Sequence, residues 1–306
     1  MNKDLLTLRD LNADDCEALF VRSLELKKRQ AAGVADRTLE GKTLGLIFDK
    51  PSTRTRVSFE AAMVQLGGAS LFLNVQDTQL IRNEPVGDTG RVLSRYLDGL
   101  VVRTYSQNLL EELAAAASIP VINGLTDLYH PCQILSDLMT ILEKKGKLEG
   151  LKIVWVGDGN NVAHSWINAA AILSLKLVVA CPKGYQPDES ILADAVKDTK
   201  GEIVVLSDPE EAVRDADVIY TDVWASMGQE SEHGLRKEIF KPSQVREGLL
   251  ALGKQDVMVM HCLPAHRGEE ISADVLEGAN SVVWDQAENK LHMHKAILER
   301  FMGGGG

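Results

Sequence analysis

Short apolar runs alternate with longer amphipathic stretches along the whole chain. A short apolar run bounded by polar residues or glycine is typical of a buried strand. We predict such strands at 43–48, 70–75, 100–104, 119–123, 151–156, 176–181, 203–206, 218–221, 257–261 and 282–284. Because helical stretches separate most successive strands, each sheet should be parallel and covered by helices on both faces.

Helical periodicity fills most of the intervening segments. We predict helices within 3–40, from Thr53 to the Gly67–Gly68 pair, after Asp88, at 109–117, 131–145, 187–197 and 209–214, around Trp166, and at 286–301. The helix after Thr53 should bury Val57, Met63, Val64 and Leu66. Residues 224–234 are polar and predict a loop.

A polar, glycine-containing break at 144–150 divides the pattern into two similar halves. The length of 306 residues also favours two domains over one. The sequence therefore predicts an α/β protein of two domains, each with a central parallel sheet flanked by helices. Polar motifs follow strands in both halves, and ligands of such sheets bind at the carboxyl ends of strands. We expect an active site in the inter-domain cleft.

Composition narrows the class of protein. The formal net charge of -11 argues against a nucleic-acid partner, which would favour a basic face. Cys16, Cys132, Cys181 and Cys262 show no CxxC spacing, so neither a zinc site nor a disulfide framework is expected. The chain shows no apolar signal segment and no run long enough to span a membrane, so we expect a cytoplasmic, reduced protein.

The segment 48–60 passes from a predicted strand through a tight loop into a helix. Ser52, Thr53, Arg54, Thr55 and Arg56 lie at this turn. Backbone N–H groups and the positive end of the helix dipole favour anions there, and forked guanidinium donors suit phosphate oxygens. We interpret the segment as a phosphate-binding site; a capped helix with solvated arginines is the alternative.

Two further motifs follow strands of the first half. Arg103 ends a predicted buried strand, where a charge needs a partner or a ligand. In the segment His130-Pro131-Cys132-Gln133, proline occupies the expected first position of a helix. His130 and Gln133 would then lie at the helix start, where both could hydrogen-bond a carbonyl or an amide, although a plain capped helix explains the motif as well.

The second half opens with Gly157-Asp158-Gly159 after a strand, which half-matches a dinucleotide-binding fingerprint. Val162 takes the place of the third glycine, and no acidic residue follows the next strand, so NAD binding is disfavoured. Asn160 and Asn161 instead offer amide groups to a small polar ligand.

Two later strands also end in polar motifs. Asp222 precedes the small-residue segment Ser226-Met227-Gly228, and its carboxylate could bind an ammonium group; helix or loop capping is the alternative. His261-Cys262-Leu263-Pro264 places a thiol at a strand end, although a free cysteine is most often structural. Metal binding by His261 with Cys262 is disfavoured, because adjacent strand residues face opposite ways.

These motifs together resemble one enzyme family. The segment 52–56 with 58–60, and the segment 130–133, resemble the carbamoyl-phosphate motifs of the aspartate/ornithine carbamoyltransferases. Asp222 with 226–228, and the segment 261–264, resemble the ornithine branch of that family. The resemblance covers nearly the whole chain and implies carbamoyl transfer from carbamoyl phosphate to the δ-amine of L-ornithine, giving L-citrulline and phosphate.

The resemblance also implies an organisation. A carbamoyl-phosphate-binding domain would comprise 1–147 together with the last helix, 286–306, and an ornithine-binding domain would comprise 148–285. The family implies a homotrimer with active sites shared between subunits, and neither a cofactor nor a metal. Arginine metabolism is the implied pathway, and the sequence leaves its synthetic or degradative direction open.

Residue roles are carried over from the same resemblance. It implies that carbamoyl phosphate is bound by Ser52, Thr53, Arg54, Thr55, Gln79, Arg103, His130, Pro131, Cys132, Gln133 and Lys290, with Gln79 reaching a neighbouring subunit. It implies that ornithine is bound by Asn161, Asp222, Ser226, Met227, Cys262 and Leu263. The catalytic residues would be Arg54, Arg103, His130, Asp222 and Cys262. Lys290 departs from the family pattern, which has arginine at this position. Lysine keeps the positive charge but lacks the forked guanidinium donors of arginine.

Three alternatives remain. Another amine, putrescine or an acylated ornithine, could accept the carbamoyl group. The chain could be a nicotinamide-dependent dehydrogenase built on the glycines at 157 and 159, or a carbamoyl-phosphate-binding protein without catalysis.

Overall fold

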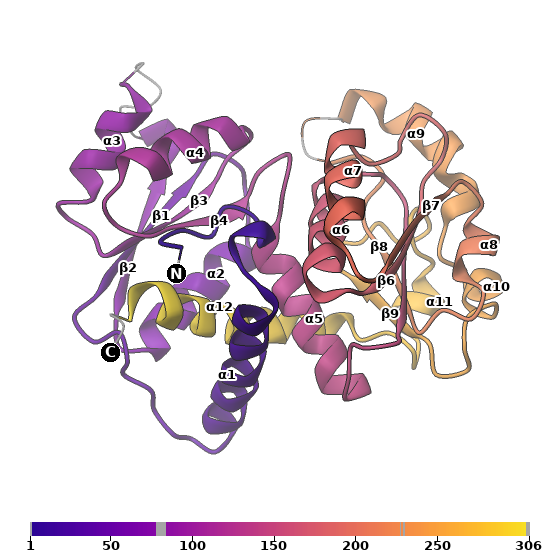
Figure 1. Cartoon of the computed structure of the whole chain (residues 1–306), viewed down its shortest axis with the longest axis horizontal. Coiled ribbons are helices and arrows are strands. Elements are labelled where there is room, and N and C mark those ends of the chain that lie inside the picture. The colour runs from indigo at the N-terminus through magenta and orange to yellow at the C-terminus, as the bar shows by residue number, and fades with distance from the viewer. Residues whose placement is uncertain (1, 78–83, 227, 229, 304–306) are drawn as a thin grey trace. The chain divides into compact units, whose positions relative to one another are not determined.

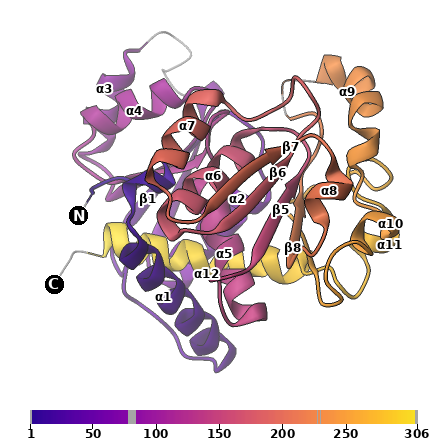
Figure 2. The same ribbon diagram turned by 45° about the vertical axis from the view of Figure 1, so that its right-hand side comes forward.

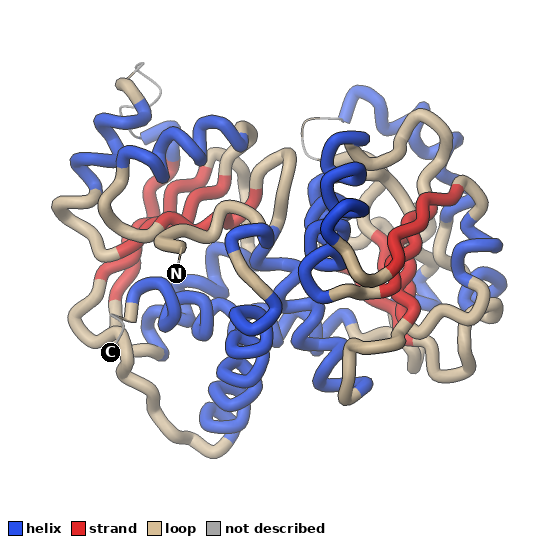
Figure 3. Tube along the Cα trace, in the orientation of Figure 1, coloured by secondary structure: helices blue, strands red, loops and turns tan. Residues whose placement is uncertain are grey.

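The computed structural model describes residues 2–77, 84–226, 228 and 230–303. It divides into two compact units. The first unit comprises Met1–Glu143 with Glu288–Gly306, and the second comprises Lys144–Ala287. Each unit holds one sheet of parallel strands between helices (Figures 1 and 3), as the alternating pattern predicts.

The sheet of the first unit has the order β2-β1-β3-β4 among the described residues. Its strands are β1 (Thr43–Phe48), β2 (Ala69–Asn74), β3 (Gly99–Arg103) and β4 (Val121–Leu125). Its helices are α1 (Ala13–Ala31), α2 (Arg54–Gln65), α3 (Val86–Leu93), α4 (Gln107–Ala116), α5 (Pro131–Lys145) and α12 (Val283–Met302), of which the last two continue past the unit boundary. Figures 1 and 2 show α3 and α4 on one face of this sheet, with α1, α2 and α12 on the other.

The sheet of the second unit has the order β7-β6-β5-β8-β9 among the described residues. Its strands are β5 (Lys152–Val156), β6 (Lys176–Ala180), β7 (Glu202–Leu206), β8 (Val218–Thr221) and β9 (Met258–His261). Its helices are α6 (Asn161–Leu173), α7 (Glu189–Asp198), α8 (Pro209–Val213), α9 (His233–Phe240), α10 (Glu247–Leu250) and α11 (Ala273–Leu276). Figures 1 and 2 show α6 and α7 on one face, with α8, α10 and α11 on the other.

Strand alternation divides the core of the second unit into two layers. Val154 and Val156 belong to a buried cluster that includes residues of α8, α10 and α11. Trp155 points the other way and stacks on Tyr220, with ring centroids 5.4 Å apart. Successive β-strand residues face opposite sides, so the buried residues of one strand supply both layers.

Both sheets reverse their strand order at one place. The reversal lies between β1 and β3 in the first unit and between β5 and β8 in the second. The loops that leave neighbouring strands at such a point turn to opposite faces, which opens a crevice at the carboxyl ends of the strands. In register, Phe48 lies beside Arg103, and Val156 lies beside Thr221. The topology therefore brings the motifs after β1, β3, β5 and β8 to the reversal points, whereas 130–133 and 261–264 follow β4 and β9, the next strands along each sheet.

Several predicted elements are wrong. The strand predicted at 282–284 is absent from this described segment, because Ser281 forms a single bridge with Val259 and α12 begins at Val283. Within the segment 3–40 predicted as helical, α1 covers only Ala13–Ala31, and Leu5 instead forms a bridge with Ile122 of β4. The polar loop predicted at 224–234 ends in the start of α9.

The predicted buried face of α2 is also wrong in part. The side chains of Val57 and Val64 lie outside the core, where they are 55% and 69% exposed. Phe59 and Ala62 are buried together with Met63. The long helix α12 covers this side of α2, and His294 stacks on Phe59 with ring centroids 3.7 Å apart. Packing by a helix distant in sequence thus selects the buried face.

Candidate functional site

The reversal point of the first unit joins the end of β3 to the loop that follows β1. The N–H of Asp49 donates to the carbonyl of Arg103 at 2.8 Å, so the loop leaves β1 directly beside the end of β3. Thr53 precedes α2, and Arg54 is its first residue. Arg103 is buried, with 6% of its surface exposed. Two arginines therefore lie near the positive end of a helix dipole, an arrangement that favours an anion.

His130 lies at the start of α5 and is almost completely buried. Burial lowers its pKa well below the ordinary value, and the charges of Lys290, Arg103 and Arg54 lower it further, as does His294. These groups are therefore close enough to act on one imidazole. His130 is neutral at physiological pH, and its N–H can donate to a ligand oxygen among permanent cations.

Gln133 connects Lys290 to a buried carboxylate. Lys290 Nζ donates to Gln133 Oε1 at 2.9 Å, and Gln133 Nε2 donates to Asp137 Oδ1 at 2.8 Å. All three residues are buried. The carboxylate of Asp137 balances part of the positive charge, and the two hydrogen bonds fix the orientation of the amide. The available signal for Asp137 was its spacing four residues after Gln133 in the predicted helix, whereas the contact of Gln133 with Lys290 depends on α12.

Two residues of the predicted motifs have other partners. Arg56 Nε donates to Glu60 Oε1 at 2.9 Å, and its guanidinium lies 3.5 Å from the centroid of the Phe72 ring. The fully buried Cys132 thiol donates to the carbonyl of Asn123 at 3.3 Å, and burial raises its pKa to about 12. Arg56 is thus engaged on the surface of α2, and the side chain of Cys132 belongs to the core.

The reversal point of the second unit joins three polar side chains. Asn160 caps α6, where its Oδ1 accepts from the N–H of Val162 at 2.9 Å. Its Nδ2 donates to Asp222 Oδ2 at 3.1 Å. The thiol of Cys262 donates to Asp222 Oδ1 at 2.9 Å. Both oxygens of the buried Asp222 carboxylate are therefore oriented, and the site presents negative charge beside a thiol.

A second carboxylate of this unit was missed by the sequence reasoning. Asp158 Oδ2 lies 3.1 Å from Arg236 Nη1. Burial raises the pKa of Asp158 to about 6, Arg236 lowers it, and Asp222 raises it further. Arg236 also donates to the carbonyl of Trp224 at 2.9 Å and to Glu232 at 2.9 Å. The spacing of Glu232 and Arg236, four residues apart, was the available signal for the start of α9.

The ligand atoms of Asp222, His261 and Cys262 lie within 4.8 Å of one another, a spacing that could hold a metal ion. The expectation that adjacent strand residues face opposite ways therefore fails here, because the side chains of His261 and Cys262 both lie near Asp222. Both ring nitrogens of His261 are nevertheless engaged: Nδ1 accepts from the N–H of Leu263 at 2.8 Å, and Nε2 donates to Glu270 Oε1 at 3.0 Å. The set thus offers a metal only one carboxylate and one thiol.

The glycines at 157 and 159 have structural causes. Gly157 has φ of 145°, a conformation that other residues rarely adopt. A Cβ on Gly159 would lie 2.3 Å from the backbone nitrogen of Pro187, so the chain before α7 fills the space beside it. The positive φ of Gly157 and the close backbone packing at Gly159, rather than a dinucleotide, explain these glycines.

The remaining predicted residues occupy the same two ends of the sheets. Ser52 and Thr53 lie in the loop before α2, with Thr55 buried in its first turn, and Pro131 begins α5. Asn161 begins α6, Ser226 is half-buried in the segment after β8, and Leu263 adopts φ of 57° after β9. Gln79 and Met227 lie outside the described residues.

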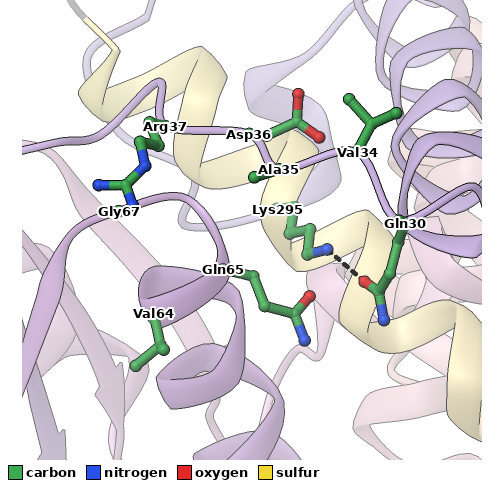
Figure 4. A pocket seen from close by; sticks show the side chains of 10 residues that line it. Gln30, Val34, Ala35, Asp36, Arg37, Val64, Gln65, Gly67 and Lys295 are labelled. Atoms are coloured by element: carbon green, nitrogen blue, oxygen red, sulfur yellow. Dashed lines mark hydrogen bonds between the residues drawn. The ribbon is translucent and has the colours of Figure 1, made fainter.

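A pocket of about 460 Å³ lies in the first unit at a different place (Figure 4). Its described lining comes from the end of α1, the following loop, the end of α2 and α12, and includes no residue predicted for the site. Lys295 donates to Gln30 across it. Burial lowers the pKa of Lys295.

Comparison with known families matches each half of the chain. Residues 3–143 match the domain described as "Aspartate/ornithine carbamoyltransferase, carbamoyl-P binding domain". Residues 149–301 match the domain described as "Aspartate/ornithine carbamoyltransferase, Asp/Orn binding domain". Within the described residues, no helix has the length and apolar content needed to cross a membrane.

Individual relatives are similar over nearly their whole length. The chain is 61% identical over 299 residues to the ornithine carbamoyltransferase of Syntrophus aciditrophicus, covering 98% of this chain and 99% of that protein. It is 55% identical to the anabolic ornithine carbamoyltransferase of Pyrococcus furiosus, covering 99% and 97%. The solved ornithine carbamoyltransferase structure from that organism has a TM-score of 0.95 at 54% identity, with 99% and 98% covered.

Proposed function

The chain belongs to the aspartate/ornithine carbamoyltransferase family, and on that premise we propose that it transfers the carbamoyl group of carbamoyl phosphate to the δ-amine of L-ornithine. The products are L-citrulline and inorganic phosphate. The observation that carries the proposal is the opposite charge of the two sheet ends: cations surround His130, whereas Asp222 accepts from Cys262. A positively charged site suits the dianionic carbamoyl phosphate, and a carboxylate site suits the amine of the acceptor.

The first unit binds carbamoyl phosphate in this proposal. Ser52, Thr53, Arg54 and Thr55 donate to the phosphate together with Arg103, and the proposed set also includes Gln79, Pro131 and Cys132. The neutral imidazole of His130 donates to the carbamoyl oxygen, and Gln133 and Lys290 orient the carbamoyl group. Negative charge grows on that oxygen and on the phosphate as the transition state forms, and each preorganised donor contributes about 2–4 kcal/mol.

The second unit binds ornithine. Asp222 and Cys262 contact the side-chain amine together with the carbonyl of Leu263, while Asn161, Ser226 and Met227 bind the amino-acid end. Attack requires a neutral amine, and deprotonating an alkylammonium at pH 7 costs roughly 4–5 kcal/mol. The Asp222–Cys262 hydrogen bond supports a role in accepting or relaying that proton. The leaving phosphate is a second acceptor for it.

The reaction proceeds by addition and elimination. The amine nitrogen bonds to the carbamoyl carbon, the amine loses one proton, and the carbon–oxygen bond to phosphate breaks. In keeping with the family resemblance, the proposal includes no cofactor.

We also propose a homotrimer in which Gln79 serves a neighbouring subunit, and a cytoplasmic location. Among the described residues no cysteine forms a disulfide, and this supports a reducing compartment. The anabolic name of the Pyrococcus furiosus relative supports a role in arginine biosynthesis.

The test supplies carbamoyl phosphate with L-ornithine, putrescine, N-acetylornithine or aspartate in separate reactions. We expect a ureido product from ornithine, identified as citrulline by mass, with much lower kcat/KM for the other amines. Faster turnover of putrescine or acetylornithine would reassign the acceptor. Absence of product with every amine, in protein that still binds carbamoyl phosphate by calorimetry, would make the chain a binding protein.

A further inference from the structure

Two histidines and two glutamates gather where the turn after β9 meets the start of α9. His266, Glu269 and Glu270 belong to the turn, and His233 is the first residue of α9. Gly268 has φ of 87°, which lets the chain reverse. The N–H of Glu269 donates to the carbonyl of His266 at 2.9 Å, so backbone geometry presents these side chains together.

The distances within this cluster suit a shared ligand. His266 Nδ1 lies 4.0 Å from Glu269 Oε2 and 3.9 Å from Glu270 Oε2. His233 Nε2 lies 3.4 Å from Glu269 Oε1. One ligand atom from each of His266, Glu269 and Glu270 lies within 4.8 Å of the others. Imidazole and carboxylate donors at these spacings need only small side-chain rotations to surround one ion.

Glu270 gives an independent indication of a ligand. Its side chain is fully buried, and its Oε1 accepts from His261 Nε2 at 3.0 Å and from the N–H of His266 at 2.6 Å. Its Oε2 accepts no hydrogen bond from the described residues. A buried carboxylate oxygen without a donor is costly, and it faces His266 across the cluster. A cation bound there would satisfy it.

We propose that this cluster binds one divalent transition-metal ion of the Zn²⁺ class. Glu270 Oε2, His266 Nδ1 and a Glu269 oxygen form the site, and His233 Nε2 supplies the fourth ligand. Mixed imidazole and carboxylate donors favour zinc over magnesium or calcium. Lys237 Nζ lies 3.1 Å from Glu269 Oε1, and this half-exposed ammonium moves into solvent when the ion binds.

The ion would act as a clamp. His233 opens the helix that carries Arg236, whereas His266 belongs to the turn after β9, so one ion ties two separate segments of the second unit together. The proposal stands on this cluster alone and does not depend on the acceptor amine or on catalysis.

Isothermal titration of the chelator-treated full chain with ZnCl₂ tests the site. We expect one bound equivalent in the unaltered protein, at least roughly tenfold weaker binding in His266→Gln, and a smaller loss in His233→Gln. Cys262→Ser is the control for metal binding at the Asp222–Cys262 pair, and this variant should still bind one equivalent of zinc. Titration with Co²⁺ should then give a spectrum without thiolate-to-metal charge transfer.

Two outcomes would overturn the proposal. One is no bound zinc in the unaltered protein. The other is loss of the equivalent in Cys262→Ser with full binding in His266→Gln, which would assign the ion to the thiol. Thermal unfolding in chelator checks whether His266→Gln folds. If this variant does not fold, zinc binding by His233→Gln, on the exposed start of α9, provides the test instead. Unchanged zinc affinity in His233→Gln rejects the four-ligand site.

Discussion

The two sheet reversal points of this chain are built alike and charged oppositely. The reversal point of the first unit holds Arg54 and Arg103 beside neutral His130. The reversal point of the second unit holds Asp222, which accepts hydrogen bonds from Asn160 and Cys262. The topology supplies a place for a ligand, and the few residues that follow each strand determine which charge the ligand carries. The net charge of -11 gives no hint of this division.

The buried titrating groups sharpen the difference. Burial lowers the pKa of His130, and the neighbouring cations act in the same direction. Burial raises the pKa of Asp158, whereas Arg236 opposes it. Both environments favour a neutral group. Around His130 the neighbouring cations reinforce that preference, whereas around Asp158 the charge of Arg236 opposes it and that of Asp222 supports it. The first site therefore keeps a neutral donor among cations, whereas the second keeps a titratable carboxylate.

The largest expected effect comes from removing the positive charge of the first site. Arg54→Met should lower kcat for citrulline formation by about 10³-fold, since a preorganised donor to the developing charge is lost. Arg56→Met is the matched control on the same helix, and because Arg56 pairs with Glu60 and Phe72 it should change kcat by no more than about threefold. Equal losses in steady-state kinetics of the two variants would contradict the assignment of Arg54.

Removing the negative charge of the second site should have a smaller and more selective effect. Asp222→Asn should lower kcat/KM for ornithine by about 50-fold, because a charged hydrogen-bond acceptor is lost, and should leave the KM for carbamoyl phosphate unchanged. Asp188→Asn, at the exposed start of α7, should leave both parameters unchanged. A rise in the carbamoyl-phosphate KM alone would place Asp222 with the wrong substrate.

The first unit should lose stability in mild acid through His294. Its pKa lies well below 6.5 in the folded chain, because it is buried and faces Lys290. As pH falls below 6.5 the unfolded chain gains a proton that the folded chain does not, so the free energy of unfolding falls by up to about 1.4 kcal/mol per pH unit. Denaturant titrations from pH 8 to 5 should show a shallower decline in His294→Gln; an identical decline would reject this linkage.

Asp158 in the second unit should act with the opposite sign. Its folded pKa of about 6 exceeds the ordinary 3.8, so the folded chain holds a proton between these values that the unfolded chain has lost. Its contribution to the free energy of unfolding therefore rises as pH falls from about 6 towards 3.8. The difference between the unaltered protein and Asp158→Asn should grow over that window in the same titrations. A difference independent of pH would mean that Arg236 keeps the carboxylate charged.

The sequence predicted those helices and strands that are determined by the residue pattern within the segment itself. β1 and β8 have the predicted bounds because each is an apolar run between polar turns. The motifs after strands were identifiable for the same reason, since parallel topology gathers strand ends at one edge. By contrast, α9, α10 and α11 were not predicted. They are short, and α9 begins at His233 within a polar segment.

Contacts between residues that are distant in the chain could not be predicted from the sequence. Lys290 meets Gln133 across 157 positions, and Asp222 meets Cys262 across 40. The exposed Val57 shows the same limit, because packing of α12 rather than helical periodicity selects the buried face of α2. Arg54 and Arg56 look equivalent in sequence, but in the structure Arg54 acts on His130, whereas Arg56 contacts Glu60 and Phe72.

The smallest expected effect concerns Lys290, a position at which the family resemblance implies arginine. Its ammonium already donates to Gln133 Oε1 at 2.9 Å in a buried site, so Lys290→Arg keeps the charge and adds a planar fork. The larger group must fit beside Gln133, and the gain in hydrogen bonding is offset by crowding. We expect kcat to change by no more than about threefold in either direction.

Lys290→Met, which leaves Gln133 Oε1 without its donor, should lower kcat at least about tenfold. If steady-state assays show equal losses in Lys290→Arg and Lys290→Met, the site requires the shape of lysine rather than its charge, and the positive character of the first site would rest on its arginines alone.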